Sequence, residues 1–148
     1  MVKDFMLAAL TQAKIAQSKH DIPIGAILVD PNNNIIAKGY NQVIDKHDPT
    51  AHAEIQVLRY AAQILKTHRF DGYDLYSTLE PCAMCAAAIS LARIKRLYFA
   101  SEDSKFGAVI SNVRYFESTI CHHKVEYYYG FYESDAKKLL KEFFMKKR

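Results

Sequence analysis

The alternation of apolar and polar residues predicts a helix near each end of the chain. At residues 3–18, apolar side chains recur at helical spacing, at Phe5, Ala9, Ala13 and Ala16. This helix should end before Asp21-Ile22-Pro23, because proline cannot continue it. Near the other end, Ser134 is a suitable helix cap. The helix that follows should bury one apolar stripe, formed by Ala136, Leu139, Leu140, Phe143 and Phe144.

Between these helices, apolar runs of strand length alternate with longer helical patterns. We predict five strands, at residues 24–29, 35–39, 73–78, 96–100 and 125–129. Turn residues at 31–34 make the first two strands a hairpin. Helices at 51–66 and 82–93 then form two strand-helix-strand units. Such units imply parallel pairing and a mixed five-stranded sheet with helices on both faces, an α/β/α arrangement in three layers. The stretch 109–118 fits either irregular structure or a short helix.

Length and composition fit a single globular domain over residues 1–148, half of it hydrophobic. The longest nearly apolar run, 83–92, is too short to span a bilayer, and Lys3 and Asp4 interrupt what a signal peptide would keep apolar. Three cysteines, two of them in one metal-binding pattern, leave Cys121 unpaired, which fits a reducing compartment. We therefore expect a soluble cytoplasmic protein.

The formal net charge of +4 is unevenly distributed. Six of the last twelve residues, 137–148, are basic, and Glu142 is the only acidic residue among them. Such a cluster could neutralise the phosphates of a nucleic acid. Basic residues near the end of a helix also complement its dipole, and the charge alone favours neither interpretation.

Two short motifs, His52-Ala53-Glu54 and Pro81-Cys82-Ala83-Met84-Cys85, carry the candidate chemistry. One imidazole and two thiols are three zinc ligands, and a catalytic zinc site typically leaves its fourth position open. His52 and Glu54 should both lie in the opening turn of the helix 51–66. The proline suits the first position of the next helix, so that the two cysteines share one face. Two partially positive helix N-termini would then converge on one metal and favour thiolates.

Either motif alone would be a weak signal. A Cys-x-x-Cys pair also fits a redox site or half of a structural zinc site. A structural site would need a fourth ligand, for which Cys121, His122 and His123 are the candidates. Together the motifs match the H-x-E…P-C-x-x-C signature of zinc-dependent nucleobase deaminases, in which the glutamate is not a ligand. The combination favours a catalytic site.

Longer segments around these motifs resemble the cytidine and deoxycytidylate deaminase superfamily: residues 21–26 (DIPIGA), 48–54 (DPTAHAE) and 78–85 (TLEPCAMC). Later segments are similar to those of bacterial tRNA-specific adenosine deaminases: residues 103–108 (DSKFGA), 122–126 (HHKVE) and the terminal helix with 142–144 (EFF). The resemblance covers nearly the whole chain. It implies a cytidine-deaminase-like fold and the conversion of the wobble adenosine of an arginine tRNA to inosine.

The resemblance also implies roles for individual residues. His52, Cys82 and Cys85 would hold one Zn²⁺ per chain, and Glu54 would move protons while hydroxide attacks C6 of adenine. Asn41 aligns with an asparagine that binds the flipped base, although it could also be a turn residue at a strand end.

Contacts with RNA and with a second subunit follow from the same likeness. Asp103 and Lys105 correspond to contacts with the anticodon loop, or are solvated loop charges. His123 matches a position near the RNA, or lies on a strand-edge surface. The family is homodimeric. At Met145 the chain lacks an arginine common in the family, and lysine, which follows, cannot reproduce the arginine fork on phosphate.

Two other functions remain open from the sequence. One is a deaminase of free guanine or of cytidine-type compounds, which would share the zinc chemistry but need no basic C-terminus. The other is a non-catalytic zinc module that binds RNA.

Overall fold

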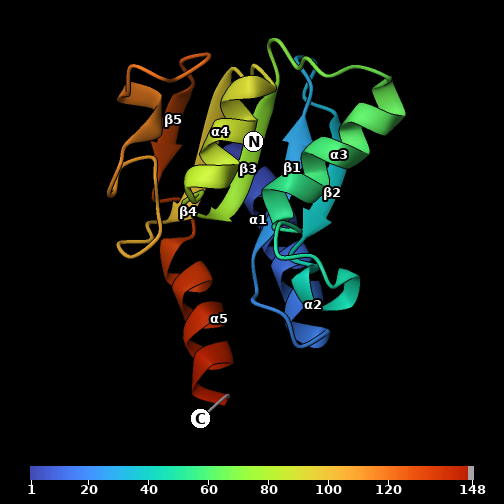
Figure 1. Ribbon diagram of the computed structural model, residues 1–148. Coiled ribbons are helices and arrows are strands. Elements are labelled where there is room, and N and C mark those ends of the chain that lie inside the picture. The colour runs from blue at the N-terminus through green and yellow to red at the C-terminus, as the bar shows by residue number, and fades with distance from the viewer. Residues whose placement is uncertain (147–148) are drawn as a thin grey trace.

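The computed structural model describes residues 1–146, and a five-stranded sheet lies at its centre (Figure 1). The strands are β1 (Gly25–Val29), β2 (Ile35–Tyr40), β3 (Asp74–Leu79), β4 (Arg96–Ser101) and β5 (Glu126–Tyr129). Their order across the sheet is β2-β1-β3-β4-β5. Each predicted strand agrees with the structure to within one residue at either end. The predicted positions of the five strands are therefore confirmed.

The pairing of the strands agrees with the prediction in part. β1 pairs antiparallel with β2, as expected of a hairpin, and β3, β4 and β5 pair in parallel. The first strand-helix-strand unit was predicted to form a parallel pair, and this was wrong, because β1 lies between β2 and β3 and pairs antiparallel with both. All five residues of β1 are buried. An interior position covered on both faces suits such a continuous apolar strand better than an edge.

Helices cover both faces of the sheet, so the predicted three-layer arrangement is confirmed (Figure 1). On one face lie α1 (Val2–Ser18) and α5 (Glu133–Lys146), and on the other α3 (Ala53–Leu65) and α4 (Ala83–Leu91). Because successive strand residues point to opposite faces, Ile27 packs in the cluster of α1 while Leu28 packs in the cluster of α3 and α4. Among the described residues, no helix combines the length and apolarity needed to cross a membrane.

The central helices begin later than predicted, and this changes the geometry of the site. α3 starts at Ala53, although Asp48-Pro49-Thr50 is typical of a helix start and Asp48 is a suitable cap for the helix predicted from 51. The Asp48 carboxylate instead accepts hydrogen bonds from the backbone N–H and the hydroxyl of Thr50, and so closes a separate turn. Pro81 does not open α4, because its carbonyl is held by Ala108 N–H at 2.9 Å, and the helix begins at Ala83.

The polar loop before α3 contains a one-turn helix that was not predicted, α2 (Val43–Lys46). The stretch 109–118 is irregular and ends in a 3₁₀ turn, η1 (Tyr115–Glu117). Either form was open from the sequence, because the apolar residues there follow no period.

α5 begins at Glu133, so Ser134 lies inside its first turn and is not its cap. Ala136 and Phe143 are buried in the stripe as predicted, but Phe144 is 51% exposed. The predicted stripe was too wide at this position, because α5 extends beyond the sheet toward its C-terminus and has less of the protein to pack against (Figure 1). Lys147 and Arg148, part of the predicted basic cluster, lie outside the described residues.

Candidate active site and metal centre

α3 and α4 begin at the same end of the molecule, and a residue with metal-binding chemistry stands immediately before each helix (Figure 1). His52 is the N-cap of α3 and Cys82 is the N-cap of α4. Both have extended backbones, with ψ of 155° and 177°. His52 was predicted within the first turn, and the structure places it one residue outside. An N-cap side chain can turn back over the open end of its helix, which explains how both ligands reach the space between the two helices.

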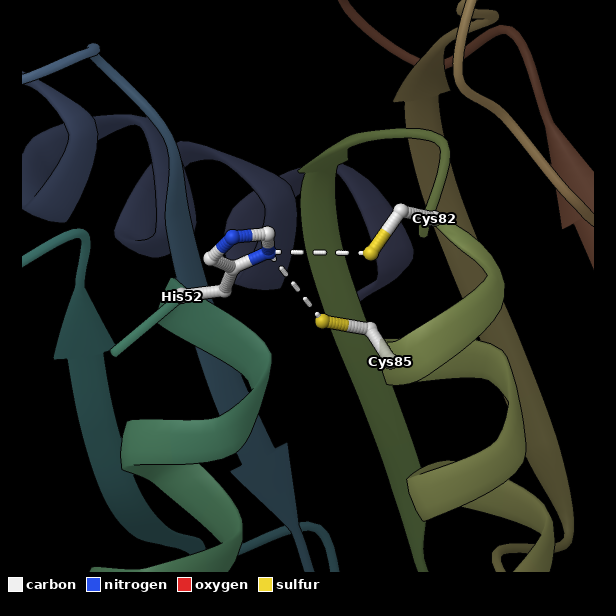
Figure 2. A group of neighbouring side chains, drawn as sticks. All are labelled: His52, Cys82 and Cys85. Carbon is white, nitrogen blue, oxygen red and sulfur yellow. Dashed lines mark hydrogen bonds between the residues drawn. The ribbon is translucent and has the colours of Figure 1, made fainter. Parts of the chain in front are cut away.

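The three candidate ligands meet in this space (Figure 2). His52 Nδ1 lies 3.6 Å from Cys82 Sγ and 3.5 Å from Cys85 Sγ, and all three atoms lie within 4.8 Å of one another. Zinc bonds of about 2.1 Å to nitrogen and 2.3 Å to sulfur, at tetrahedral angles, place the two ligand atoms about 3.6 Å apart. The observed separations match that value. These residues therefore fit a single Zn²⁺ ion.

The pKa shifts of these groups also suit a metal site. Hydrogen bonding with Cys85 lowers the pKa of the Cys82 thiol to about 4, and the same contact, together with burial, raises the pKa of Cys85. Hydrogen bonding with Cys82 raises the pKa of His52. One thiolate, one thiol and an imidazole thus share protons that a divalent cation would displace.

Among the described residues, the group that could hold a metal contains only these three ligands. The candidates for a fourth, structural ligand lie elsewhere. Cys121 contacts Ser90 near the end of α4, with Sγ and Oγ 3.5 Å apart, and its thiol donates to the carbonyl of His123 at 3.2 Å. His122 lies beside Arg93, which follows the same helix. The geometry is that of a site with an open position, which is typical of catalytic zinc.

Glu54 stands in the first turn of α3 and faces the same space. Its side chain is only 4% exposed and lies against Ser77 and Cys85. Burial raises the pKa of its carboxyl group to about 7. A carboxyl group in this position can exchange protons with a molecule bound beside the metal ligands.

A cavity of about 880 Å³ opens in front of the ligands. Asn41, which follows β2, forms part of its wall and is buried. Its Oδ1 accepts a hydrogen bond of 2.9 Å from the backbone N–H of Ala53, the first residue of α3. This contact fixes the orientation of the amide. Within the described part of the chain, its Nδ2 has no hydrogen-bond partner, so a donor remains for a ligand in the cavity.

The far wall of the cavity is formed by residues 101–106 and by α5. Asp103 Oδ1 accepts hydrogen bonds from the backbone N–H groups of Lys105 and Phe106, which shapes this segment into a turn. The Lys105 ammonium lies 5.2 Å from the centre of the Phe106 ring. Asp103 and Lys105, predicted to bind substrate, are thus brought to the cavity with Asn41 and Glu54.

His123 is not brought to the cavity. Its Nε2 lies 3.1 Å from the carbonyl of Ile94, and its backbone N–H donates to Ser90. Both neighbours lie at the C-terminal side of α4, whereas the metal ligands lie at its N-terminal end. Within one chain, His123 is therefore remote from the predicted chemistry.

The sequence analysis did not single out several residues of the cavity wall, among them Glu80, Phe106 and Phe144. Glu80 precedes Pro81 and is 2% exposed, while Phe106 and Phe144 are 64% and 51% exposed. An acidic residue directly after an apolar strand could have drawn attention to Glu80. The two phenylalanines offered no such signal, and Phe144 had been predicted in the buried stripe of the terminal helix.

Comparisons with known proteins agree with this geometry. The cytidine and deoxycytidylate deaminase zinc-binding region matches residues 1–101 of the chain. Over 144 residues the chain is 49% identical to the tRNA-specific adenosine deaminase of Rickettsia bellii (strain RML369-C), covering 97% of this chain and 99% of the relative.

Two solved structures are also similar. One comes from biochemical and structural studies of A-to-I editing by tRNA:A34 deaminases at the wobble position of transfer RNA. It has a TM-score of 0.90 at 48% identity, and covers 93% of this chain and 99% of that chain. The other is the guanine deaminase of Bacillus subtilis, with a TM-score of 0.66 at 32% identity, covering 84% and 82% of the respective chains.

Proposed function

The chain belongs to the cytidine and deoxycytidylate deaminase family, and from this we propose that it converts adenosine to inosine at the wobble position of a tRNA anticodon loop, with an arginine tRNA as its substrate. The resemblance predicted from the sequence and the cytidine-deaminase-like fold are confirmed. One observation carries the proposal: a single cavity is lined by His52 and Cys82 of the metal-binding group, by the buried Glu54 and Asn41, and by a charged outer wall.

The reaction needs an activated water and a group that moves protons. Zinc held by His52, Cys82 and Cys85 would act as a Lewis acid. It would lower the pKa of water so that hydroxide is available as a nucleophile near neutral pH. Glu54 takes one proton from the attacking water and gives it to N1 of the purine. The second proton of the water passes through the same carboxylate to the amine, which leaves as ammonia. Water and adenosine are thus converted to inosine and ammonia, and Glu54 returns to its starting state.

Asn41 orients the base. Because its Oδ1 is engaged by Ala53 N–H, the amide presents its NH₂ group to the cavity. A purine offers nitrogen acceptors along its edge, so this donor can hold the ring with C6 toward the metal ligands. The same contact makes the start of α3 part of the base-binding surface.

The outer wall supports a substrate larger than a free base. Lys105 is exposed at the mouth of the cavity, and Lys137 of α5 lines the same wall. Lysine side chains can contact phosphates that flank an extruded nucleotide. We assign Asp103 and Lys105 to the anticodon loop, where the target base can leave the stack at low cost.

Two further assignments depend on assembly. We propose a homodimer in which His123, remote from the cavity of its own chain, contacts RNA bound at the cavity of the partner. Each chain would form one domain over residues 1–148, and the dimer would then contain two copies of every RNA contact. As an enzyme acting on tRNA, the protein would work in the cytoplasm.

A direct assay tests the proposal against the alternatives. The zinc-loaded protein is incubated with an arginine tRNA that carries adenosine at the wobble position, and in parallel with guanine and cytidine, and inosine and ammonia are measured. We expect inosine to form in the tRNA, and no ammonia to be released from guanine or cytidine. Turnover restricted to guanine or cytidine would replace the proposal with a free-base deaminase, to which the similarity with a guanine deaminase points. Binding of tRNA without any turnover would indicate a non-catalytic module.

A further inference from the structure

A buried carboxylate joins the metal-binding turn to the outer wall of the cavity. Glu80 follows β3 and directly precedes Pro81 and Cys82, and it is 2% exposed. Its Oε1 accepts hydrogen bonds of 2.9 Å from Asp103 N–H and from the Ser111 hydroxyl. Its Oε2 accepts three more, of 2.9 to 3.0 Å, from consecutive backbone N–H groups, at Val109, Ile110 and Ser111. Both ends of the segment 103–111 are therefore attached to one side chain.

These five donors stabilise the negative charge of the buried Glu80 carboxylate. No ion pair among the described residues includes it. The backbone N–H donors of Asp103, Val109, Ile110 and Ser111 compensate for the burial of the carboxylate. An ionised carboxylate has about four lone-pair sites, and five donors occupy them. Although it borders the cavity, Glu80 thus has no free acceptor with which to bind a substrate.

The segment also packs closely against the metal-binding turn. Ala108 N–H donates to the Pro81 carbonyl at 2.9 Å, and Gly107 pairs with Cys82 in an isolated β-bridge. A Cβ atom at Gly107 would overlap the carboxylate of Glu80. Glycine at this position therefore allows the backbone to reach the carboxylate, and the two parts hold each other in place.

The segment 103–111 carries side chains that would contact parts of the substrate other than the reacting base. Asp103, Lys105 and Phe106 form the outer wall, and none of them is a metal ligand. We propose that Glu80 is a positioning residue that sets the segment 103–111, and with it the substrate-facing wall, relative to the metal-binding turn. As applied to RNA, this inference rests on the function proposed above.

The variant Glu80→Gln tests this role with little change of shape. An amide keeps one acceptor oxygen but turns an NH₂ group toward backbone N–H donors, so at least two hydrogen bonds are lost. We expect KM for tRNA to rise by about tenfold or more, the effect of losing hydrogen bonds to a charged group. We expect kcat to stay within about threefold of wild type, because the reacting groups are unchanged. Zinc content should remain one ion per chain.

Two further variants and an independent measurement complete the test. Gly107→Ala should reproduce the rise in KM, whereas Glu126→Gln, at an exposed carboxylate on β5, should change neither constant. Amide hydrogen exchange is followed at residue 103 and at 109–111 in wild type, Glu80→Gln and Glu126→Gln. Faster exchange at these amides in Glu80→Gln alone is the expected result.

The outcomes separate this inference from the proposed function. A wild-type protein that does not deaminate tRNA would reject the function, and hydrogen exchange would then decide the role of Glu80 alone. Unchanged exchange at 103 and 109–111 in Glu80→Gln would overturn the inference. So would loss of zinc, or a fall in kcat with KM unaltered, since both would place Glu80 in the chemistry and not in positioning.

Discussion

The two sides of the cavity differ in construction. On the inner side, His52 and Cys82 precede two helices that are packed on the sheet, and Glu54 and Cys85 are buried. On the outer side, Lys105, Phe106 and Phe144 are exposed on a turn and on the projecting end of α5. The inner side is fixed by the core, and the outer side is fixed by Glu80 and by local hydrogen bonds. The difference suggests that the reaction is determined by the inner side and the choice of substrate by the outer side.

The largest effect should come from removing a ligand on the inner side. We expect Cys85→Ser to lose zinc and all measurable deaminase activity, because a neutral hydroxyl is a far weaker zinc ligand than a thiolate. Metal content per chain and inosine formation are measured together. Cys121→Ser is the matched control and should keep both, since Cys121 lies away from the cavity. Full zinc occupancy in Cys85→Ser would show that the ligand set is wrong.

The next effect separates chemistry from metal binding on the same side. Glu54→Ala should retain zinc and bind tRNA normally, but kcat should fall by about 10²- to 10⁴-fold, as for other general acid–base residues. Single-turnover measurements with saturating enzyme check the chemical step. A variant with normal kcat would remove Glu54 from the mechanism and with it the main distinction between the two sides.

Asn41 lies where the two sides meet, and a pair of variants separates its two roles. Asn41→Asp keeps the acceptor for Ala53 N–H but loses the NH₂ donor, so we expect wild-type stability with KM raised about tenfold, the worth of one hydrogen bond. Asn41→Ala loses both and should also unfold about 1 kcal/mol more easily, as when a helix cap is removed. Thermal unfolding and kinetics are compared for both. Equal stability of the two variants would show that the hydrogen bond from Ala53 N–H to Asn41 does not stabilise the start of α3.

A smaller effect is expected on the outer side. Lys105→Ala should weaken tRNA binding a few-fold and reduce the slope of log Kd against log salt concentration by about one, the result of losing one phosphate contact. Lys14→Ala, at an exposed lysine of α1, should leave the slope unchanged. Binding is measured across a series of salt concentrations. An unchanged slope in Lys105→Ala would leave the turn without a role in RNA binding.

The smallest effect concerns the attachment of the outer side to the inner. Hydrogen bonds hold the pKa of folded Glu80 below its usual value, so its contribution to stability is complete above the unfolded pKa of about 4.3 and declines as the pH falls through the folded value. The difference in unfolding free energy between wild type and Glu80→Gln should therefore shrink on acidification. Denaturant unfolding from neutral to acidic pH, with both proteins compared at each pH, measures it. A constant difference would exclude an ionised Glu80 in the fold.

The sequence predicted the inner side better than the outer. Strand positions followed from apolar runs, and the ligands followed from the spacing of His52, Cys82 and Cys85, because chemistry restricts which residues can serve there. The exact helix starts were missed for two reasons. Asp48 closes a local turn with Thr50 and does not cap the helix, and the Pro81 carbonyl accepts from Ala108, which is distant in sequence.

The outer side was less accessible to prediction for a physical reason. Phe144 has the spacing of a buried residue, and only the projection of α5 past the sheet leaves it exposed. Glu80 appears in sequence as one acidic residue beside a proline. Its five donors come from positions 23 to 31 residues later in the chain, and no local pattern announces them. The antiparallel pairing of β1 with β3 was also missed, because the choice of neighbouring strands depends on the whole sheet and not on a local pattern.

The separation of His52 from Cys82 by thirty residues has a consequence for synthesis in the cell. While the chain emerges from the ribosome, the histidine is present before either sulfur exists, and for that interval the nascent polypeptide cannot capture a metal with its full set of ligands. The cysteines, in turn, can form only half a site until their helix docks beside the earlier one. Acquisition of the ion would then report that both helices have reached their final places, and chains that fail to dock would remain without it.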